Sequence, residues 1–349
     1  MWLLYGAYGF TGALIADYAV QQGMRPVLAG RSEAKLRPLA ERLGLDYRVF
    51  GLDNLPVLID HIRDFDLVFH AAGPFVVTAD RMMQACALSG THYLDITGEI
   101  VVFERSIVYD EITRKNNCAL ISGVGFDVVP STCLAQYVAN QLPDATQLDI
   151  AIDSLTRISS GTARTAVVNG ASGGWIRRKG KLVPYPLGAG AKTVQFNHRA
   201  RWAMPIPWGD LVTSYRSTGI PNVITYMAFP QHIITLARFG GPIGQFLLSI
   251  GPIRSLFSGL TPLLFKGPND QQREQFRSHL WVQATNDAGE QAQAWLETPE
   301  PYVFTALAGL QAVERTLAEN PSGVLTPAQA FGPDFPLAIA GVQRFDQLS

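Results

Sequence analysis

Three glycines near the start of the chain, Gly6, Gly9 and Gly12, are spaced so that their backbone could hold a phosphate group. They follow a short apolar run and open an amphipathic segment, TGALIADYAV. A strand, a glycine loop and a helix in this order direct backbone N–H groups and the positive helix end at a pyrophosphate. Because the chain has 32 glycines, this context carries the interpretation rather than the spacing alone. The residues assigned to this loop are Gly6, Tyr8, Gly9, Phe10, Thr11 and Gly12.

The second expected strand ends in Gly30, Arg31 and Ser32, with Lys35 one turn later. An NAD site usually has an acidic residue here, which binds the ribose hydroxyls. A carboxylate would repel a 2′-phosphate, whereas a guanidinium can bind one, and a charge-assisted hydrogen bond contributes about 1.5–3 kcal/mol. We therefore expect NADP, in its reduced form NADPH, with these four residues around the phosphate. The alternative is that Ser32 caps the next helix and Arg31 is solvated.

Two further segments complete the predicted dinucleotide site. Asp53 follows the third expected strand and can accept a hydrogen bond from the adenine amino group, or it can cap the helix that follows. The fourth strand ends in HAAGPF, whose small residues would let the backbone approach the ribose beside the nicotinamide. The expected contacts in that segment are Ala71, Ala72, Gly73, Pro74 and Phe75.

Three carboxylates follow the fifth and sixth expected strands, Asp95, Glu99 and Asp127. Ligands of an open α/β sheet bind at the carboxyl ends of its strands, so these are the candidate catalytic residues. Asp127, in GFDVVP, comes first because it lies at the predicted domain junction. The structural alternatives are that Asp127 caps a helix or bridges the domains, and that Asp95 and Glu99 bind backbone amides of their loop. His70 lies at the same edge, where a buried strand-end histidine is the ordinary interpretation.

Other reaction classes have little support in the sequence. No tyrosine is followed by lysine four residues later, so the proton donor of short-chain dehydrogenases is missing. Neither HxxxH nor HExxH occurs, and no GxSxG motif is present, which disfavours a metal site and a serine hydrolase. A bound nicotinamide would supply the hydride, so the protein would only orient it and stabilise charge on the substrate.

Apolar runs alternate with segments of helical length through the first 125 residues. The expected strands cover residues 2–5, 26–29, 47–50, 66–71, 93–96 and 118–122. The expected helices cover residues 11–22, 33–43, 55–63, 80–89 and 100–116. This alternation is typical of right-handed βαβ units, and it predicts an α/β fold with a doubly wound parallel sheet, a Rossmann domain.

After Gly125 the strands become longer, which indicates a second α+β domain built on a mainly antiparallel sheet. Its expected strands cover residues 147–152, 193–197, 211–218, 222–229, 278–284 and 291–297. Its expected helices cover residues 131–141, 163–175, 231–237, 271–275 and 302–320. We expect an NADP-binding domain over 1–125, a substrate and dimerisation domain over 126–330, and a C-terminal segment, 331–349, that returns to the first domain.

The composition limits the partners and the location of the chain. Its 349 residues include 28 basic and 29 acidic side chains, a formal net charge of -1, so no overall field attracts nucleic acid. The three cysteines contain no CxxC pair, and no signal peptide precedes the first strand, so a cytoplasmic location is expected. Residues 217–237 and 239–253 carry no charged side chain. They indicate a buried core or a homodimer interface, with peripheral membrane contact as the alternative.

An ordered set of motifs along nearly the whole chain carries a resemblance to a known family. The motifs are GAYGFTG, AGR, AAGPF, YLDITGE, GFDVVPS, SGTARTA, WGDLVTSYRSTGIPNV and KGPNDQQR. In this order they resemble the saccharopine dehydrogenase-like oxidoreductases, and their short branch that includes mycobacterial trans-acting enoyl reductases. Departures at Tyr8, His70, Val128 and Thr132 concern the substrate rather than the cofactor. The resemblance implies an N-terminal domain that binds NAD(P) and a C-terminal domain that closes the substrate cleft.

These observations lead to one expected function and two alternatives. We expect an oxidoreductase that uses NADPH to reduce a C=C or C=N bond in an apolar acyl or lipid-like small molecule. The first alternative is saccharopine-type C–N chemistry on an amino acid, for which Arg157, Arg164 and Arg177 could bind carboxylates. The second is a non-catalytic protein that retains the fold at a membrane surface or in an assembly.

Overall fold

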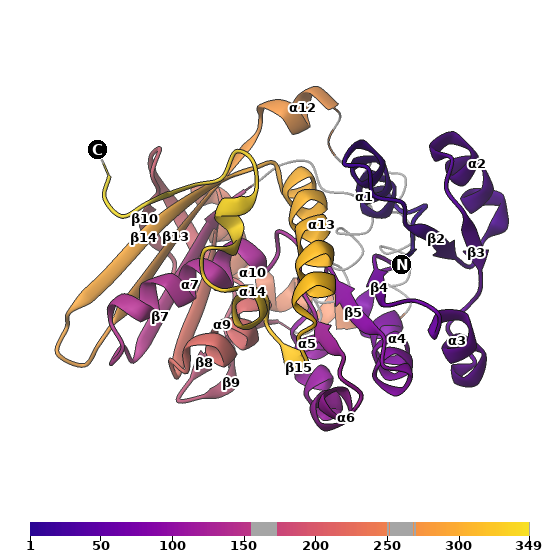
Figure 1. Cartoon of the computed structure of the whole chain (residues 1–349). Coiled ribbons are helices and arrows are strands. Elements are labelled where there is room, and N and C mark those ends of the chain that lie inside the picture. The colour runs from indigo at the N-terminus through magenta and orange to yellow at the C-terminus, as the bar shows by residue number, and fades with distance from the viewer. Residues whose placement is uncertain (155–172, 250, 252–267, 269, 349) are drawn as a thin grey trace. The chain divides into compact units, whose positions relative to one another are not determined.

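The computed structural model describes residues 1–154, 173–249, 251, 268 and 270–348 (Figure 1). The contacts between its residues divide the chain into two units. Unit 1 contains Met1–Val129 and Tyr302–Gly332, and unit 2 contains Pro130–Pro301 and Pro333–Ser349. Each unit has its own sheet and is described separately.

Unit 1 holds a parallel sheet of seven strands within the described residues, in the order β15-β6-β5-β4-β1-β2-β3. The strands are β1 (Trp2–Tyr5), β2 (Val27–Gly30), β3 (Tyr47–Val49), β4 (Leu67–His70), β5 (His92–Asp95), β6 (Ala119–Ile121) and β15 (Gly323–Leu325). Nearly every residue of the central strands is buried, as the uninterrupted apolar run of β1 requires when helices cover both faces of a sheet.

The helices of unit 1 connect these strands. They are α1 (Phe10–Gln21), α2 (Glu33–Leu43), α3 (Leu55–Ile62), α4 (Phe75–Ser89), α5 (Ile100–Ser106), the 3₁₀ turn η1 (Ile107–Tyr109), α6 (Asp110–Lys115), α13 (Pro301–Glu319) and α14 (Pro327–Phe331). The chain runs outward from β1 to β2 and β3, and then crosses to β4 on the other side of β1. This reversal between β1 and β4 is the point where open α/β sheets bind their ligands.

Unit 2 is built on a mixed sheet in the order β10-β11-β12-β7-β13-β14-β16, with β8 paired to β12 and to β9. Its described strands are β7 (Gln147–Asp153), β8 (Gly174–Arg178), β9 (Lys181–Tyr185), β10 (Lys192–Gln195), β11 (Ala200–Pro205), β12 (Asn222–Ala228), β13 (Arg277–Thr285), β14 (Gln291–Pro299) and β16 (Gln343–Phe345). Of these pairs only β7 and β12 are parallel. Its described helical segments are α7 (Val129–Gln141), α9 (Asp210–Thr218), α10 (Gln231–Ser249), α12 (Asp270–Gln275) and η2 (Phe335–Ala338).

The predicted fold class is confirmed by these two sheets, but two predicted elements differ. Residues 211–218, expected as a strand, form helix α9, which starts with Asp210 in its first turn and ends at Gly219 with a φ of 76°. Those are ordinary helix start and stop signals, and they outweigh the β-branched residues of the segment. The helix expected over 163–175 lies mostly outside the described residues, and its last residue, Trp175, belongs to strand β8.

The domain boundaries also differ from the expected ones at the C-terminal end. Residues 302–330 were expected in the second domain, yet Tyr302–Gly332 belongs to unit 1. The reason is strand β15, which pairs in parallel with β6 and extends the first sheet (Figure 1). The last segment does not return to the first domain, because β16 pairs with β14 in unit 2.

The two uncharged stretches bear on membrane association. Among the residues that the structure describes, no helix combines the length and the apolar character needed to cross a bilayer.

Candidate active site

The glycine loop between β1 and α1 has a backbone that only glycine fits at two positions. Gly6 has a φ of 87°, and a Cβ there would lie 2.7 Å from the backbone nitrogen of Ala72. A Cβ on Gly12 would collide with the Gly6 carbonyl oxygen. The loop is closed by a hydrogen bond from the Gly9 N–H to the Gly6 carbonyl, at 3.0 Å. Gly6 therefore lets the loop approach Ala72, and Gly12 lets helix α1 approach the loop.

The N-terminus of α1 is suited to an anion. Its N-cap residue is Gly9, and no side chain caps the helix there. The first intrahelical bond runs from the Ala13 N–H to the Gly9 carbonyl at 2.8 Å, and Phe10 and Thr11 are partly exposed. A glycine N-cap leaves room for an external acceptor at the positive helix end.

The end of β2 gathers the residues expected to bind a 2′-phosphate. The Tyr8 ring packs over Gly30, where a Cβ would lie 2.6 Å from the ring, and the Lys35 ammonium lies 5.6 Å from the ring centroid. Arg31 is exposed, and within the described part of the chain it has neither an ion pair nor a hydrogen bond to a side chain. Ser32 is the N-cap of α2, but its hydroxyl makes no capping bond. Ser32 thus has the predicted N-cap position and Arg31 is exposed, but the Ser32 hydroxyl does not make the capping bond.

Asp53 is available for a ligand because its neighbour is the capping residue. The Asn54 side chain accepts a hydrogen bond from the Val57 N–H at 3.3 Å and caps α3, while Asp53 is exposed. The Tyr5 hydroxyl donates to the Phe50 carbonyl at 3.2 Å. Burial raises the pKa of Tyr5 to about 12, and the next influences on it come from Tyr8, Arg31 and Asp53. These groups therefore lie around the same end of β1, β2 and β3.

A relay of hydrogen bonds fixes the segment after β4. The Thr78 hydroxyl, from α4, donates to the Ala72 carbonyl at 2.6 Å and lies 3.2 Å from the Pro74 carbonyl. Since that proton is used, the Thr78 oxygen accepts from His70 Nε2 at 3.0 Å. His70 is fully buried, and burial lowers its pKa to about 3, so the ring stays neutral. Its Nδ1 has no partner among the described residues. Thr78 was missed from the sequence, because nothing distinguishes it from any other threonine in a helix.

Asp95 is buried and surrounded by donors. Its Oδ1 accepts from the Thr97 N–H at 3.0 Å and from the Gly123 N–H at 2.8 Å, and its Oδ2 accepts from the Tyr93 hydroxyl at 2.7 Å. Burial raises its pKa, and these bonds work against the rise. This arrangement joins the loops after β5 and β6, and it favours the structural interpretation of Asp95.

Glu99 caps a helix that is distant in sequence. Its two carboxylate oxygens accept from the Phe75 N–H at 3.2 Å and the Val76 N–H at 2.7 Å, at the start of α4. The predicted interpretation as a ligand of backbone amides therefore describes its contacts, although the amides belong to α4 rather than to its own loop. Glu99 thus joins the loop after β5 to the segment expected to meet the nicotinamide ribose.

Asp127 has the electrostatic properties of a proton donor at neutral pH. Burial, and then the nearby charge of Glu99, raise its pKa to about 7. It lies against Gly98, where a Cβ would come within 2.8 Å of Asp127 Oδ2. The residue as a whole is partly exposed, although its carboxyl group is buried. A strongly raised carboxyl pKa at the ligand edge of a sheet marks a candidate acid or base.

Arg177, one of the arginines considered for an amino-acid substrate, has its guanidinium engaged within unit 2. Its side chain donates to the Leu211 carbonyl and, at 2.6 Å, to the Gly180 carbonyl, and it lies over the Tyr215 ring. Arg157 and Arg164 lie outside the described residues.

A comparison with protein families identifies the first part of the chain. Residues 2–120 match the family described as the saccharopine dehydrogenase NADP binding domain. The matched range contains the glycine loop, Arg31, Asp53 and the 71–75 segment. The resemblance predicted from the sequence is thereby confirmed over this part of the chain.

Curated relatives match a similar share of the chain. The trans-acting enoyl reductase of Mycobacterium ulcerans is 31% identical over 137 residues, and that of Mycobacterium tuberculosis is 33% identical over the same length. Each alignment covers 37% of this chain and 33% of the relative. The chain therefore matches about a third of the length of these relatives.

Two solved structures match nearly the whole chain. Saccharopine dehydrogenase (L-Glu forming) from Saccharomyces cerevisiae gives a TM-score of 0.64 at 12% identity, covering 98% of this chain and 99% of the other. Homospermidine synthase from Legionella pneumophila, in complex with NAD, gives 0.67 at 9% identity, covering 99% and 91%. At these identities the likeness concerns the fold. It agrees with the predicted fold class, a Rossmann domain followed by an α+β domain.

Proposed function

Because residues 2–120 belong to the saccharopine dehydrogenase NADP-binding family, we propose that this chain is an oxidoreductase that uses NADPH to reduce a C=C or C=N bond in an apolar acyl or lipid-like substrate. The observation that carries the proposal is the end of β2, where an exposed Arg31 and an unused Ser32 hydroxyl stand where an NAD site has a carboxylate. Together with the glycine loop, they form a site for a dinucleotide with an additional phosphate.

The residues present fit such a cofactor. Gly6, Gly9 and the N-terminus of α1 would hold the pyrophosphate, and Arg31, Ser32 and Lys35 would hold the 2′-phosphate. Asp53 would accept from the adenine amino group. The bound cofactor supplies the hydride, and the chain's own residues orient it and provide the proton.

Asp127 is the residue we assign to proton transfer. Reduction of C=C or C=N adds a hydride to one atom and a proton to its neighbour, so an acid that is still protonated near pH 7 is required or a water must replace it. The pKa of Asp127, raised to about 7, meets this requirement, and the residue is partly exposed. In this assignment Glu99 acts through Asp127 as a positioning residue, and Asp95 holds the loops together.

Two observations bear on which bond is reduced, the names of the relatives and the contacts of Arg177. Curated relatives that match 37% of the chain bear the name trans-acting enoyl reductase, which supports a C=C bond. A C–N reaction on an amino acid would need cations that bind the substrate carboxylates. The guanidinium of Arg177 is instead hydrogen-bonded to backbone carbonyls. We therefore favour the acyl substrate over the amino-acid alternative.

The test is a fluorescence titration of the purified chain with NADPH and NADH, in parallel with Arg31→Ala and a control. The control is Arg63→Ala, an exposed arginine at the C-cap of α3. The proposal expects tighter binding of NADPH than of NADH in the natural chain and in the control, and a ten- to hundredfold loss of that preference in Arg31→Ala. An equal affinity for both cofactors in the natural chain would refute the NADP assignment. Enoyl thioesters and cyclic imines are then compared as substrates by the loss of NADPH absorbance.

A further inference from the structure

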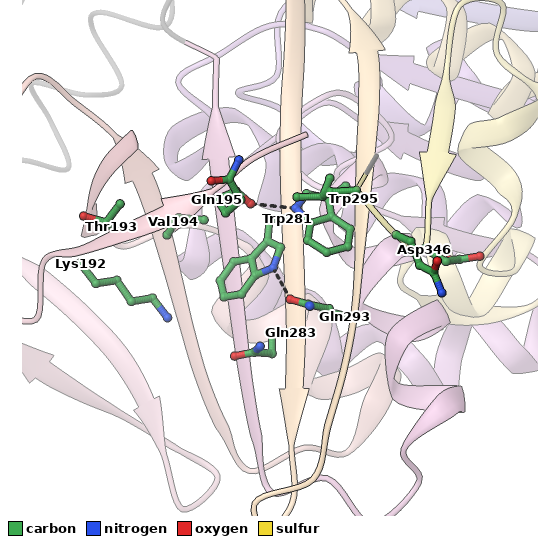
Figure 2. A pocket seen from close by; sticks show the side chains of 11 residues that line it. Lys192, Thr193, Val194, Gln195, Trp281, Gln283, Gln293, Trp295 and Asp346 are labelled. Carbon is green, nitrogen blue, oxygen red and sulfur yellow. Dashed lines mark hydrogen bonds between the residues drawn. The ribbon is translucent and has the colours of Figure 1, made fainter. Parts of the chain in front are cut away.

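A cavity of about 590 Å³ opens on one face of the unit 2 sheet (Figure 2). It is lined by β10, β13, β14 and the segment 346–348. Strand β10 is at the end of the strand order, yet it reaches β14 across this face, because the Trp295 indole donates to the Gln195 carbonyl at 2.8 Å. The sheet therefore curls, and its edge strand forms one wall of the cavity. All the lining residues belong to unit 2, so the cavity is separate from the residues assigned to the dinucleotide.

The aromatic residues of the cavity form a wall rather than a stacking platform. Trp281 and Trp295 retain only 7% and 5% of their surface accessible. The Lys192 ammonium lies 4.9 Å from the Trp281 ring centroid and 4.6 Å from that of Tyr226, so one side of the indole is already covered. A nucleobase would find no open indole face on which to stack. A ligand that contacts only an indole edge can still bind.

Two glutamine side-chain amides have fixed orientations, because one is bonded to a group that can only donate and the other to a group that can only accept. The Trp281 Nε1–H can only donate, so the atom it meets at 3.0 Å is Gln293 Oε1, and the Gln293 amino group remains to donate (Figure 2). The Phe196 carbonyl can only accept, so the atom it meets at 2.8 Å is Gln195 Nε2, and Gln195 Oε1 remains to accept. The cavity therefore offers donors and acceptors together.

The cation of the cavity is already paired, and its carboxylate accepts a hydrogen bond. The Lys192 ammonium binds Asp149 Oδ2 at 2.5 Å. Asp346 Oδ1 accepts from the Tyr137 hydroxyl at 3.0 Å, which leaves its second oxygen as an acceptor. A phosphate or a carboxylate ligand would find no uncompensated cation in the described lining, and it would face Asp346. A neutral ligand is therefore favoured.

We propose that this cavity binds a neutral glycosyl group. A hydroxyl is the group that donates and accepts at once, so adjacent sugar hydroxyls can accept from Gln293 Nε2 and donate to Gln195 Oε1 or Asp346 Oδ2. The indole edges provide apolar surface for the C–H side of the ring, and the volume lies within the range of about 300–1,000 Å³ common for small-molecule sites. The same glycosyl chemistry occurs in a free oligosaccharide and in a glycolipid headgroup.

The experiment follows the indole N–H resonances of Trp281 and Trp295 in the full chain by NMR, assigned with Trp281→Phe and Trp295→Phe. The probes are maltose, cellobiose and lactose, and vesicles of phosphatidylcholine with or without digalactosyl diacylglycerol. Glycerol at equal hydroxyl concentration reports unspecific solvent effects. We expect saturable shifts of both resonances with at least one disaccharide or with the galactolipid vesicles, and none with glycerol.

The variants decide whether this cavity is responsible. Gln195→Ala removes an exposed side chain and keeps the backbone carbonyl that Trp295 uses, so it should weaken binding about tenfold without unfolding the sheet. Gln141→Ala, an exposed glutamine in α7 of the same unit, should leave the affinity unchanged. Saturation by free disaccharides identifies a soluble glycoside, and saturation by galactolipid vesicles alone identifies a headgroup. Absence of shifts with every probe, or equal affinity in Gln195→Ala, would overturn the proposal.

Discussion

In unit 1 the glycine loop assigned to the pyrophosphate acts through its backbone, whereas in unit 2 the cavity residues act through their side chains. Gly6 and Gly12 matter because they have no Cβ, and the phosphate would meet N–H groups. Gln195 and Gln293 matter because of the amides they present. The glycine loop and the cavity should therefore respond in opposite ways to mutation, since the loop is blocked by added atoms and the cavity is weakened by atoms removed.

The largest effect we predict comes from adding one methyl group to the glycine loop. In Gly12→Ala the new Cβ would collide with the Gly6 carbonyl, so α1 or the loop must move away from the position that an anion requires. NADPH affinity should fall at least about a hundredfold, a change of about 2.7 kcal/mol. Titration by NADPH fluorescence measures it.

The control for this variant is Gly240→Ala. A Cβ at Gly240 would make an ordinary contact, 3.6 Å from Leu236 Cδ1, and the backbone there is not left-handed. NADPH affinity should be unchanged. Normal affinity in Gly12→Ala would mean that the cofactor binds elsewhere, and the contrast between a backbone site and a side-chain site would fail.

The second effect concerns the one side chain that unit 1 contributes to chemistry. Asp127→Asn removes the proton, so turnover should fall about 10²–10⁴-fold while the Kd for NADPH stays within twofold. Stability should change in the other direction. Because the folded-state pKa of about 7 is above the ordinary 3.8, the folded chain holds its proton longer, and stability falls as pH rises between these values.

The thermal midpoint of Asp127→Asn at pH 8 should therefore exceed that of the natural chain by a few degrees, and the gain should shrink toward pH 4. A higher thermal midpoint together with lost turnover would indicate that burial of the Asp127 carboxyl lowers stability and serves catalysis. Full turnover in this variant would exclude Asp127 as the proton donor and would leave water in that role.

The same contrast explains which features the sequence could predict. The glycine loop, Arg31 and the parallel strands follow from local patterns, because a backbone site needs particular residues at fixed spacing. Thr78 and Gln195 carry no such pattern, since their roles depend on partners that folding brings close, the carbonyl of Ala72 and the edge of a curled sheet. Helix α9 was predicted as a strand because its β-branched residues favour a strand, and the helix stop signal at Gly219 was not taken into account. The assignment of β15 to unit 1 and of β16 to unit 2 depends on strand pairing between residues far apart in the sequence, which local sequence patterns do not reveal.

A smaller effect is predicted for Thr78, which positions the 71–74 segment without contacting the cofactor in our proposal. Thr78→Val removes the donor to the Ala72 carbonyl and the acceptor for His70, while keeping the shape of the side chain. NADPH affinity should weaken about three- to tenfold, the usual net value of one hydrogen bond. Thr78→Ser keeps the hydroxyl and should restore the affinity. Equal loss in both variants would show that the methyl group, rather than the relay, is important.

The smallest effect tests whether a pair of histidines in unit 2 responds to pH in the direction opposite to Asp127 of unit 1. In unit 2 the rings of His198 and His279 stack with centroids 3.8 Å apart. Asp153 lies 3.4 Å from His198 Nε2, and Glu297 lies 3.6 Å from His279 Nδ1. Arg199 donates to His198 at 3.1 Å, and Arg201 pairs with Asp153 at 3.4 Å. Burial lowers the pKa of both histidines, and the neighbouring arginines lower it further while the two carboxylates oppose them.

Since both folded-state pKa values lie below 6.5, the unfolded chain takes up protons first, and stability falls as pH decreases through 6.5. In unit 1, Asp127 has the opposite trend, whereas the buried His70 has the same trend as these histidines. The thermal midpoint of the natural chain should thus fall by a few degrees more between pH 7.5 and 5 than that of His198→Asn. The control is His232→Asn, an exposed histidine in α10 that should behave like the natural chain. An unchanged pH dependence in His198→Asn would mean that Asp153 and Glu297 fully compensate the protonated rings.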